Sequence, residues 1–226
     1  MCGRFTLFTP WEQLALAFPW ISGPFEAPPR YNIAPTQGVA AVPNTKERRV
    51  GLFHWGLVPF WAKDPKIGSR MINARSETLA EKPSFRTAYR RRRCLVLADG
   101  FYEWRKIEGR RNKIPYFFHL KAGGPFAFAG LWETWHSPDG SELLSCTVIT
   151  TRPNEIVAPI HNRMPVILPP EAQLPWLDPA ERSPAELGPL LQPYPAAEMA
   201  AYPVATLVNS PANDLPDCIA AAENGA

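Results

Sequence analysis

Cys2, the second residue of the chain, is placed to do chemistry that no internal cysteine can do. Once Met1 is removed, Cys2 carries a free α-amine beside its thiol, and this 1,2-aminothiol can attack an aldehyde twice to close a thiazolidine ring. The same pair suits acyl transfer, in which the terminal amine acts as base for its own side chain. Reference pKa values of about 7.7 for the amine and about 8.5 for the thiol leave both groups usable near neutral pH. The residue type narrows the chemistry without choosing between these two reactions.

Segment 72–78 places an amide, a guanidinium and a carboxylate around an expected helix start: Asn73, Arg75 and Glu77. Backbone N–H groups at such a start favour anions, including phosphate. The alternative is an ordinary helix cap with a surface ion pair. This segment alone does not separate a phosphate site from a cap.

The Asp-Gly pair at 99–100 indicates a tight turn, and the residues after it alternate in character. With a period of two, Phe101 and Glu103 share one face of a strand, opposite Tyr102 and Trp104. A carboxylate beside a large aromatic ring is either a rim residue or a buried acid with a raised pKa. The second state suits proton transfer near neutrality.

His161 precedes an apolar strand and is a candidate acid or base, with Arg163 available for a phosphate. A structural histidine is the alternative. The four histidines show no metal-ligand spacing, and the sequence has no P-loop, no GxGxxG after a strand, no HExxH and no zinc-deaminase pattern. We therefore expect no metal and no cofactor.

A run of four arginines at 90–93 lies among further cations, and several tryptophans and phenylalanines fall in the same half of the chain. Arginines beside exposed aromatic rings form the usual platform for unpaired nucleic-acid bases. A solvated basic face and core tryptophans would give the same pattern. The segment is thus a candidate nucleic-acid surface.

The composition allows one large domain and a polyanionic partner. The 226 residues are 46% hydrophobic and carry a formal net charge of +3. The four cysteines lie far apart without a CxxC pair, which favours a reducing compartment. Neither a leader pattern nor a membrane-spanning apolar run is present in the sequence. We expect a cytoplasmic protein, nucleoid-associated if bacterial, that does not bind membranes and is a monomer.

Alternating apolar residues predict many short strands, at 4–8, 38–42, 50–57, 94–98, 101–105, 114–120, 125–131, 143–150 and 163–168. Thr9 is expected to cap a short helix that has Pro10 at its first position, and further helical pieces are expected at 76–79 and 84–89. Segment 23–36 is predicted to be a loop. The 27 prolines argue against long helices.

These elements predict an α+β fold: a β-rich single domain over 1–226, with mostly antiparallel strands in a barrel-like core and short peripheral helices. We place the core at about 2–215. The Ala- and Pro-rich tail from residue 169 is expected to wrap the core with short helical turns, and its last few residues to be loose.

The order of the motifs resembles the SOS-response-associated peptidase (SRAP) family from residue 2 to about residue 215. The motifs are Met-Cys-Gly-Arg-Phe at 1–5, Tyr-Asn-Ile-Ala-Pro at 31–35, Trp-Gly-Leu-Val-Pro at 55–59 with Trp61, Asn-Ala-Arg-Ser-Glu-Thr at 73–78, Asp-Gly-Phe-Tyr-Glu-Trp at 99–104, His-Asn-Arg-Met-Pro at 161–165 and Val-Asn-Ser-Pro at 208–211. The resemblance implies a β-rich α+β domain that recognises abasic sites in single-stranded DNA and crosslinks to them through the N-terminal cysteine. It also implies abasic-site lyase activity and an N-terminus that processes itself, and it allows an association with replication forks.

The resemblance also implies roles for particular residues. The catalytic set is Cys2, Asn73, Glu103 and His161: Asn73 would hold Cys2 and the sugar, Glu103 would position the amine and shuttle protons, and His161 would assist ring opening and reversal. Arg4, Arg75 and Arg163 would grip flanking phosphates, while Pro35 and Trp61 would shape the path of the bases. Trp104 competes with Trp61 as the ring that stacks on a base.

Two other classes of function remain open at this stage. N-terminal-nucleophile hydrolases, including glutamine amidotransferases, also begin Met-Cys-Gly, although they usually continue with Ile where this chain has Arg4. A non-catalytic reader of single-stranded or modified DNA would make Cys2 incidental. Abasic-specific covalent adducts, glutamine hydrolysis and simple binding distinguish the three classes.

Overall fold

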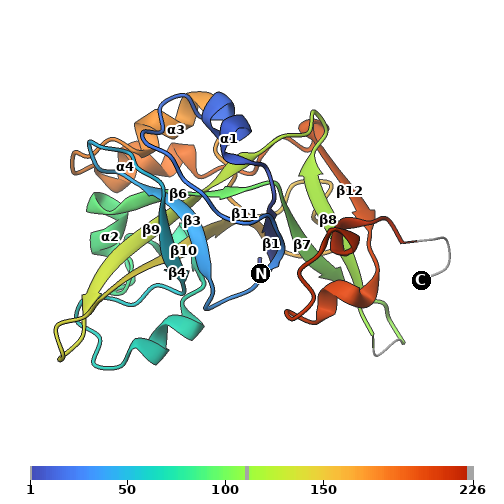
Figure 1. Ribbon diagram of the computed structural model, residues 1–226, viewed down its shortest axis with the longest axis horizontal. Helices are drawn as coiled ribbons and strands as arrows, with labels where there is room; N and C mark the ends of the chain where they lie inside the picture. The colour runs from blue at the N-terminus through green and yellow to red at the C-terminus, as the bar shows by residue number, and fades with distance from the viewer. Residues whose placement is uncertain (1, 110–111, 223–226) are drawn as a thin grey trace.

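Five strands close into a barrel at the centre of the computed structural model, which describes residues 2–109 and 112–222 (Figure 1). They are β3 (Gly38–Pro43), β4 (Gly51–Trp55), β6 (Arg93–Ala98), β9 (Phe126–His136) and β10 (Glu142–Thr151). The pairing runs β10-β4-β3-β6-β9 and returns from β9 to β10, and only the β4–β10 contact of this ring is parallel. The barrel-like, mostly antiparallel core predicted from the sequence is confirmed.

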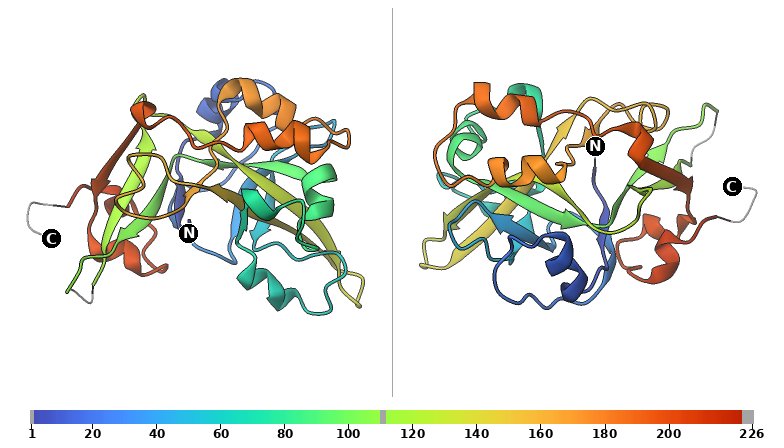
Figure 2. Two further views of the ribbon diagram at one scale, coloured as in Figure 1. Left: turned by 180° about the vertical axis from the view of Figure 1, so that it is seen from behind. Right: turned by 90° about the horizontal axis from the view of Figure 1, so that it is seen from above.

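A second sheet of five antiparallel strands lies beside the barrel, in the order β12-β8-β7-β1-β2. Its strands are β1 (Phe5–Leu7), β2 (Arg30–Ile33), β7 (Gly100–Arg105), β8 (Ile114–Leu120) and β12 (Met199–Pro203). Figure 2 shows β1 between the barrel and the outer strands β8 and β12. Buried side chains from the barrel and from this sheet form one hydrophobic cluster, so the two parts share a core.

Two short strands pair with the C-terminal end of β10, one on each side. β5 (Asn73–Arg75) pairs with it in parallel, and β11 (Met164–Pro165) pairs with it in antiparallel fashion. Asn73 lies opposite Val148, and Met164 lies opposite Thr151. Chain segments almost ninety residues apart in the sequence therefore meet at one end of the barrel.

The helices are short and lie outside the sheets. The α-helices are α1 (Trp11–Ala17), α2 (Arg86–Arg91), α3 (Pro170–Trp176) and α4 (Pro184–Leu187). The short 3-10 helices are η1 (Pro65–Arg70), η2 (Ser76–Thr78), η3 (Gly188–Leu190), η4 (Ala196–Glu198), η5 (Thr206–Asn209) and η6 (Pro216–Ile219). Among residues 2–109 and 112–222, each helix is too short or too polar to cross a bilayer.

The predicted helix cap at Thr9 is wrong. The N-cap of α1 is Pro10, which has no capping side chain, and the Thr9 hydroxyl instead donates to Asp99 Oδ1 over 2.5 Å. The other oxygen of Asp99 accepts the N–H groups of Phe8 and Thr9. A buried carboxylate at the β6–β7 turn thus fixes the end of β1, because it satisfies three donors there that would otherwise lack partners.

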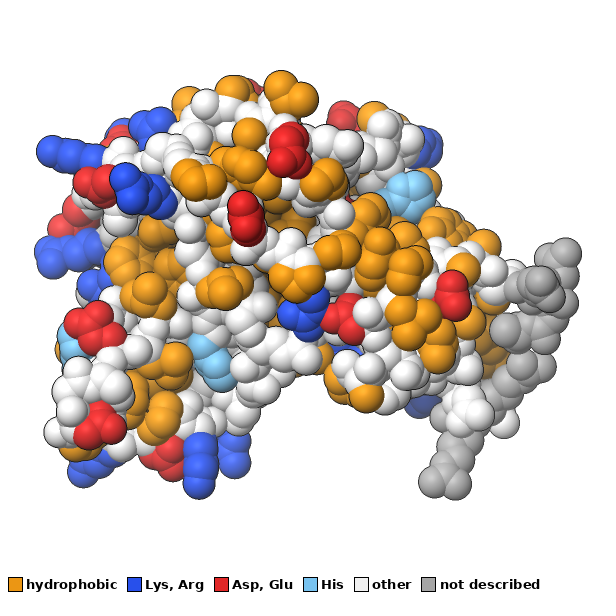
Figure 3. Space-filling view, viewed as in Figure 1, with side chains coloured by type: hydrophobic (Ala, Val, Ile, Leu, Met, Phe, Trp, Pro, Cys, Tyr) orange, Lys and Arg blue, Asp and Glu red, His pale blue; other side chains and the backbone are white. Residues whose placement is uncertain are grey.

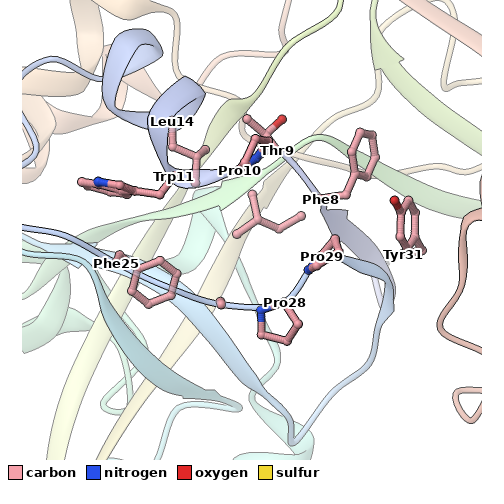
Figure 4. A pocket seen from close by; sticks show the side chains of 11 residues that line it. Phe8, Thr9, Pro10, Trp11, Leu14, Phe25, Pro28, Pro29 and Tyr31 are labelled. Carbon is pink, nitrogen blue, oxygen red and sulfur yellow. The ribbon is translucent and has the colours of Figure 1, made fainter.

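The predicted loop at 23–36 contains β2, and the tail predicted to hold only helical turns contains β12. The chain before β2 folds over α1 around an apolar pocket of about 270 Å³, where Phe25, Pro28 and Pro29 face Trp11 and Leu14 (Figure 4). The expected loose residues at the very end of the tail lie at 223–226, outside the described residues.

The arginine run at 90–93 does not form one exposed basic stripe. Arg90 and Arg91 pair with Glu181, and Arg92 pairs with the buried Glu133. In Figure 3, basic and acidic side chains accordingly mix over the α2 side of the molecule. Arg93 is fully buried, and its five N–H donors all reach main-chain carbonyls, those of Tyr89, Arg90, Trp176, Asp178 and Ala180.

Arg93→Met should lower the free energy of unfolding by about 3 to 5 kcal/mol, because each of five carbonyls around the buried side chain loses a charged donor. Arg91→Met is the matched control, since it removes only an exposed ion pair with Glu181 and should cost less than about 1 kcal/mol. Urea unfolding followed by circular dichroism measures both. Equal losses for the two variants would contradict the structural role of Arg93.

Candidate functional site

Cys2 is fully buried where β1 enters between β2 and β7. Asn73 donates from Nδ2 to the Cys2 carbonyl oxygen over 2.7 Å, and the Cys2 thiol lies 3.9 Å from the carbonyl oxygen of Arg4. The Oδ1 atom of Asn73 is buried and has no hydrogen-bond partner among the described residues. Cys2 is therefore held by its main chain, beside an amide oxygen that is ready to accept a further hydrogen bond.

A tryptophan of the barrel positions the segment that carries Asn73. Trp55 is fully buried at the end of β4, stacks edge-on against Phe5 at 4.9 Å and donates from Nε1 to the carbonyl oxygen of Ile72 over 2.9 Å. The chain leaves β4 at Gly56, where φ is 141° and an added Cβ would lie 2.6 Å from the Gly68 carbonyl oxygen. Only glycine fits at Gly56, where the chain passes against Gly68. The chain then returns to β10 and pairs with it as β5.

Glu103 points toward the barrel, as the alternation of β7 predicts. Phe101 on the same face belongs to the main core cluster, whereas Tyr102 and Trp104 pack into a second cluster under the C-terminal segment. Glu103 is 3% exposed, and its Oε1 lies 3.9 Å from Nδ1 of His161. Burial raises the pKa of Glu103 to about 7. This carboxyl group is therefore suited to exchange protons at neutral pH.

His161 comes from the loop that joins β10 to β11. Its backbone N–H bonds to the carbonyl of Val157 over 2.9 Å, and its Nδ1 accepts the backbone N–H of Arg163 over 3.1 Å. Burial lowers the pKa of His161, which favours the neutral ring. Nδ1 also lies 3.2 Å from the carbonyl oxygen of Arg163, to which it donates in the other tautomer, so the loop can hold either neutral tautomer of His161.

The same environment acts on the thiol. Burial, followed by the charge of Glu103, raises the pKa of Cys2. The thiol is therefore protonated at neutral pH and needs a base before it can attack. Glu103 is the nearby group whose pKa suits that task.

Of the three arginines predicted to grip phosphates, Arg75 is exposed and its side chain makes no hydrogen bond or ion pair with the described residues. Arg163 forms a two-pronged ion pair with Glu77 at 2.7 and 2.9 Å and also donates to Thr150. Arg4 donates to Asn32 Oδ1 and to the carbonyl of Val208, each over 2.8 Å. Arg75 is thus the arginine of the three most available to a strand.

The predicted strand-shaping residues lie on the surface in different settings. Trp61 is 50% exposed beside Phe60, which is 58% exposed, in the loop after β4. Pro35 is half-exposed and precedes Thr36, which adopts a φ of 71°. Trp104 is half-buried and donates from its indole to Asn209 Oδ1 over 2.7 Å. Trp61 is the most freely presented of these rings, since the Arg92 guanidinium lies 6.0 Å from the centre of the Phe60 ring and Trp104 is held by its hydrogen bond.

An open groove of about 710 Å³ runs beside Trp104. Its lining includes Arg4, Lys113 and Asn209. Sequence reasoning gave no role to Lys113, because a single lysine before a strand carries no local signal, and none to Asn209, although it lies in the Val-Asn-Ser-Pro motif at 208–211. Among residues 2–109 and 112–222, no three Asp, Glu, His or Cys side chains come together in a way that could hold a metal ion.

A family model described as SOS response associated peptidase (SRAP) matches residues 1–211. The chain belongs to the SRAP family. The resemblance inferred from the motifs is confirmed.

Named relatives of this SRAP chain cover nearly its whole length. The abasic site processing protein YoqW of Bacillus subtilis (strain 168) is 49% identical over 222 residues, which are 97% of this chain and 99% of YoqW. The abasic site processing protein HMCES of Mus musculus is 32% identical over 272 residues, which are 99% of this chain and 76% of HMCES.

Solved structures share the SRAP fold described above. A crystal structure of a protein from Bacteroides thetaiotaomicron has a TM-score of 0.88 at 30% identity and covers 98% of this chain and 100% of its own. A second, from Bordetella bronchiseptica, has a TM-score of 0.76 at 26% identity and covers 90% of this chain and 100% of its own.

Glu103→Gln should change how stability depends on pH. A carboxyl group whose pKa is about 7 in the folded state and about 4.5 in the unfolded state binds its proton more tightly when folded, so the wild type loses stability as pH rises from 4.5 to 7. The neutral amide escapes this loss, which is on the order of 3 kcal/mol at most. Urea unfolding at pH 5 and pH 8 should show Gln gaining on Glu at the higher pH.

Glu108→Gln, an exposed carboxylate after β7, serves as the control and should give the same difference from wild type at both pH values. A Glu103→Gln difference that is equally independent of pH would contradict the raised pKa of Glu103.

Proposed function

We propose that this protein binds abasic sites in single-stranded DNA and joins them covalently through the α-amine and thiol of Cys2 after Met1 has been removed. The single observation that carries the proposal is the placement of Cys2: its carbonyl is held by Asn73, and its thiol lies within the electrostatic reach of Glu103. The names of YoqW and HMCES, which are abasic site processing proteins, support the choice of substrate.

The first step is the opening of the sugar. An abasic deoxyribose is mostly a closed hemiacetal, and opening moves one proton off its hydroxyl and another onto the ring oxygen, which is general acid–base work. The neutral ring of His161 carries one proton that it can give, and Glu103, with a pKa of about 7, accepts or returns one at neutral pH. The free Oδ1 of Asn73 suits a sugar hydroxyl.

The two nucleophiles of Cys2 then act in a fixed order. The amine lone pair forms the bond to the C1′ aldehyde carbon, and one water leaves as the imine forms. The thiol, kept protonated by burial, then adds across the carbon–nitrogen double bond, its sulfur joining C1′ while its proton passes through Glu103 to the nitrogen. The product is a thiazolidine, and the net change is the loss of one water.

Strand cleavage is the alternative fate of the same imine. If a base removes a proton from C2′ before sulfur closes the ring, the electrons expel the 3′ phosphate by β-elimination. Glu103 or His161 serves as that base in the proposal, so crosslinking and lyase activity compete at one site. We also include processing of the N-terminus by the protein itself, because the amine must be released from Met1 before either reaction.

Arg75 provides the exposed cation for the strand that carries the abasic site. Arg163 contributes once a phosphate shares its guanidinium with Glu77. Exposed Phe60 and Trp61 offer apolar faces to neighbouring bases. The proposed setting is cytoplasmic DNA, where single strands are exposed during replication.

The decisive assay incubates the Met1-free protein with single strands that carry an abasic site, an intact base or a tetrahydrofuran residue, which lacks the aldehyde. Only the abasic strand should give a band that survives denaturation, with a mass equal to the sum of both partners minus one water. Absence of that adduct, or the same adduct with tetrahydrofuran, would end the proposal.

Cys2→Ser should keep the amine but lose the stable ring. We expect an adduct that is trapped only when borohydride is present, and more strand cleavage for each imine formed. The measurement is a denaturing gel with and without heating. A heat-stable adduct from this variant without borohydride would exclude thiazolidine closure, and retention of Met1 should abolish both products because an acylated amine cannot form an imine.

Arg75→Ala should weaken binding to a tetrahydrofuran strand and flatten its salt dependence. Loss of one phosphate contact lowers the slope of log K against log salt by about 0.7 for single strands. Arg86→Ala, an exposed cation on α2, is the control and should leave the slope unchanged. Fluorescence anisotropy across a salt series measures both, and an unchanged slope for Arg75→Ala would remove Arg75 from the strand path.

A further inference from the structure

The apolar pocket between α1 and the chain before β2 lies outside the proposed reaction site. It has a volume of about 270 Å³, and none of its eleven lining residues is charged. Trp11 and Leu14 of α1 face Phe25 and Pro28 across it (Figure 4). A cavity of about 150 Å³ lined by apolar side chains accepts a benzene ring, so this pocket has room for a bulky apolar side chain.

The rim of this pocket is exposed to solvent and is stiff. Three of the lining residues, Pro10, Pro28 and Pro29, are exposed prolines, each of which has a fixed φ and lacks an N–H group. Phe8 and Tyr31 stack at 5.2 Å at one end of the pocket. A ligand therefore meets a surface that needs little ordering and that selects apolar shape more than hydrogen-bonding groups.

The two charged residues that adjoin this apolar lining within α1 and segment 25–29 are both carboxylates. Glu12 follows Trp11, and Glu26 lies between Phe25 and Ala27. Both are exposed, and neither forms an ion pair with the described residues. In Figure 3, the surface over α1 carries acidic side chains among hydrophobic ones, and the basic side chains of this view lie outside that patch. Although the chain has a formal net charge of +3, this surface therefore favours a cationic partner.

The pocket is separated from Cys2 by the length of β1. Leu7, the last residue of β1, lines the pocket, and the five residue steps back to Cys2 span about 16 Å at about 3.3 Å per residue. Asp99 binds the backbone N–H groups of Phe8 and Thr9 in the pocket wall, so this wall is held independently of Cys2. An occupant of the pocket therefore leaves the surroundings of Cys2 free.

We propose that this pocket is the docking site of a partner protein, which inserts one bulky apolar side chain between α1 and the chain before β2 and places neighbouring basic residues against Glu12 and Glu26. Leu16, one turn after Glu12 on the exposed face of α1, is 81% exposed and enlarges the apolar area offered to such a segment. Nucleic acid is excluded as the occupant because its phosphates would face both carboxylates. The inference does not rest on the chemistry proposed for Cys2.

The probe is a short, end-blocked peptide with one phenylalanine between pairs of lysines, titrated into the full-length protein labelled with ¹⁵N. The indole N–H signal of Trp11 should shift as the peptide binds. A matched peptide with alanine in place of phenylalanine should bind at least about tenfold more weakly, because it buries no ring. A matched peptide with glutamines in place of the lysines should bind about fivefold more weakly at about 0.05 M salt, and this difference should shrink as salt screens the charges.

Two sets of variants separate the pocket from its charged surroundings. Ala27→Trp places an indole over the exposed side of the pocket and should abolish peptide binding at every salt concentration. Glu12→Lys combined with Glu26→Lys should weaken binding of the lysine peptide about tenfold at about 0.05 M salt and leave the glutamine peptide unaffected. Glu108→Lys, at an exposed carboxylate after β7, is the matched control and should change neither affinity.

The proposal is overturned if the lysine peptide leaves the Trp11 signal unshifted at millimolar concentration, or if the glutamine peptide binds as tightly as the lysine peptide. Free indole that binds as tightly as the lysine peptide would assign the pocket to a small apolar molecule instead. A dimer in sedimentation velocity that Ala27→Trp abolishes would assign this surface to a second copy of the chain. Either of these results would also overturn the partner proposed above.

Discussion

The pairing of β1 on both of its sides is the constraint on which the rest of the structure depends. A nucleophile at the start of a chain is ordinarily free to move, since terminal residues are the least ordered part of most domains. Here β2 and β7 hydrogen-bond to the strand that follows Cys2, while Asp99 fixes its far end. Cys2 therefore occupies a defined position, and β7 brings Glu103 to it without a flexible loop.

Burial favours the uncharged form of each titratable group around Cys2. It keeps the thiol protonated, raises the pKa of Glu103 to about 7 and keeps His161 neutral. A protonated thiol is a poor first nucleophile, so the amine has the first encounter with an aldehyde and sulfur follows only when a base is ready. The order of the proposed steps thus depends on the exclusion of solvent. The same burial lowers the free energy of unfolding at high pH, because Glu103 must then be charged in the folded protein.

Local sequence patterns predicted the features that depend on residues close together in the chain. Alternation placed Glu103 and Trp104 on opposite faces of one strand, and the many short strands indicated the barrel. The roles of the arginines at 90–93 could not be predicted, because most of the carbonyls and carboxylates that bind them lie about forty to ninety residues further on. The strands β2 and β12 were missed because their proline- and alanine-rich surroundings carry no alternation, and their pairing partners decide their conformation.

Asn32 is fully buried and donates to the main-chain carbonyls of Val208, Ser210 and Asn213, which joins the end of the chain to its beginning. During synthesis, residues near the N-terminus emerge first, and domains begin to fold before the chain is complete. The groove beside Trp104, which Asn209 helps to line, is not complete until the segment through Asn213 has left the ribosome. The contacts that hold Arg4, two residues after Cys2, to the carbonyls of Val208 and Asn209 are therefore completed only at the end of translation.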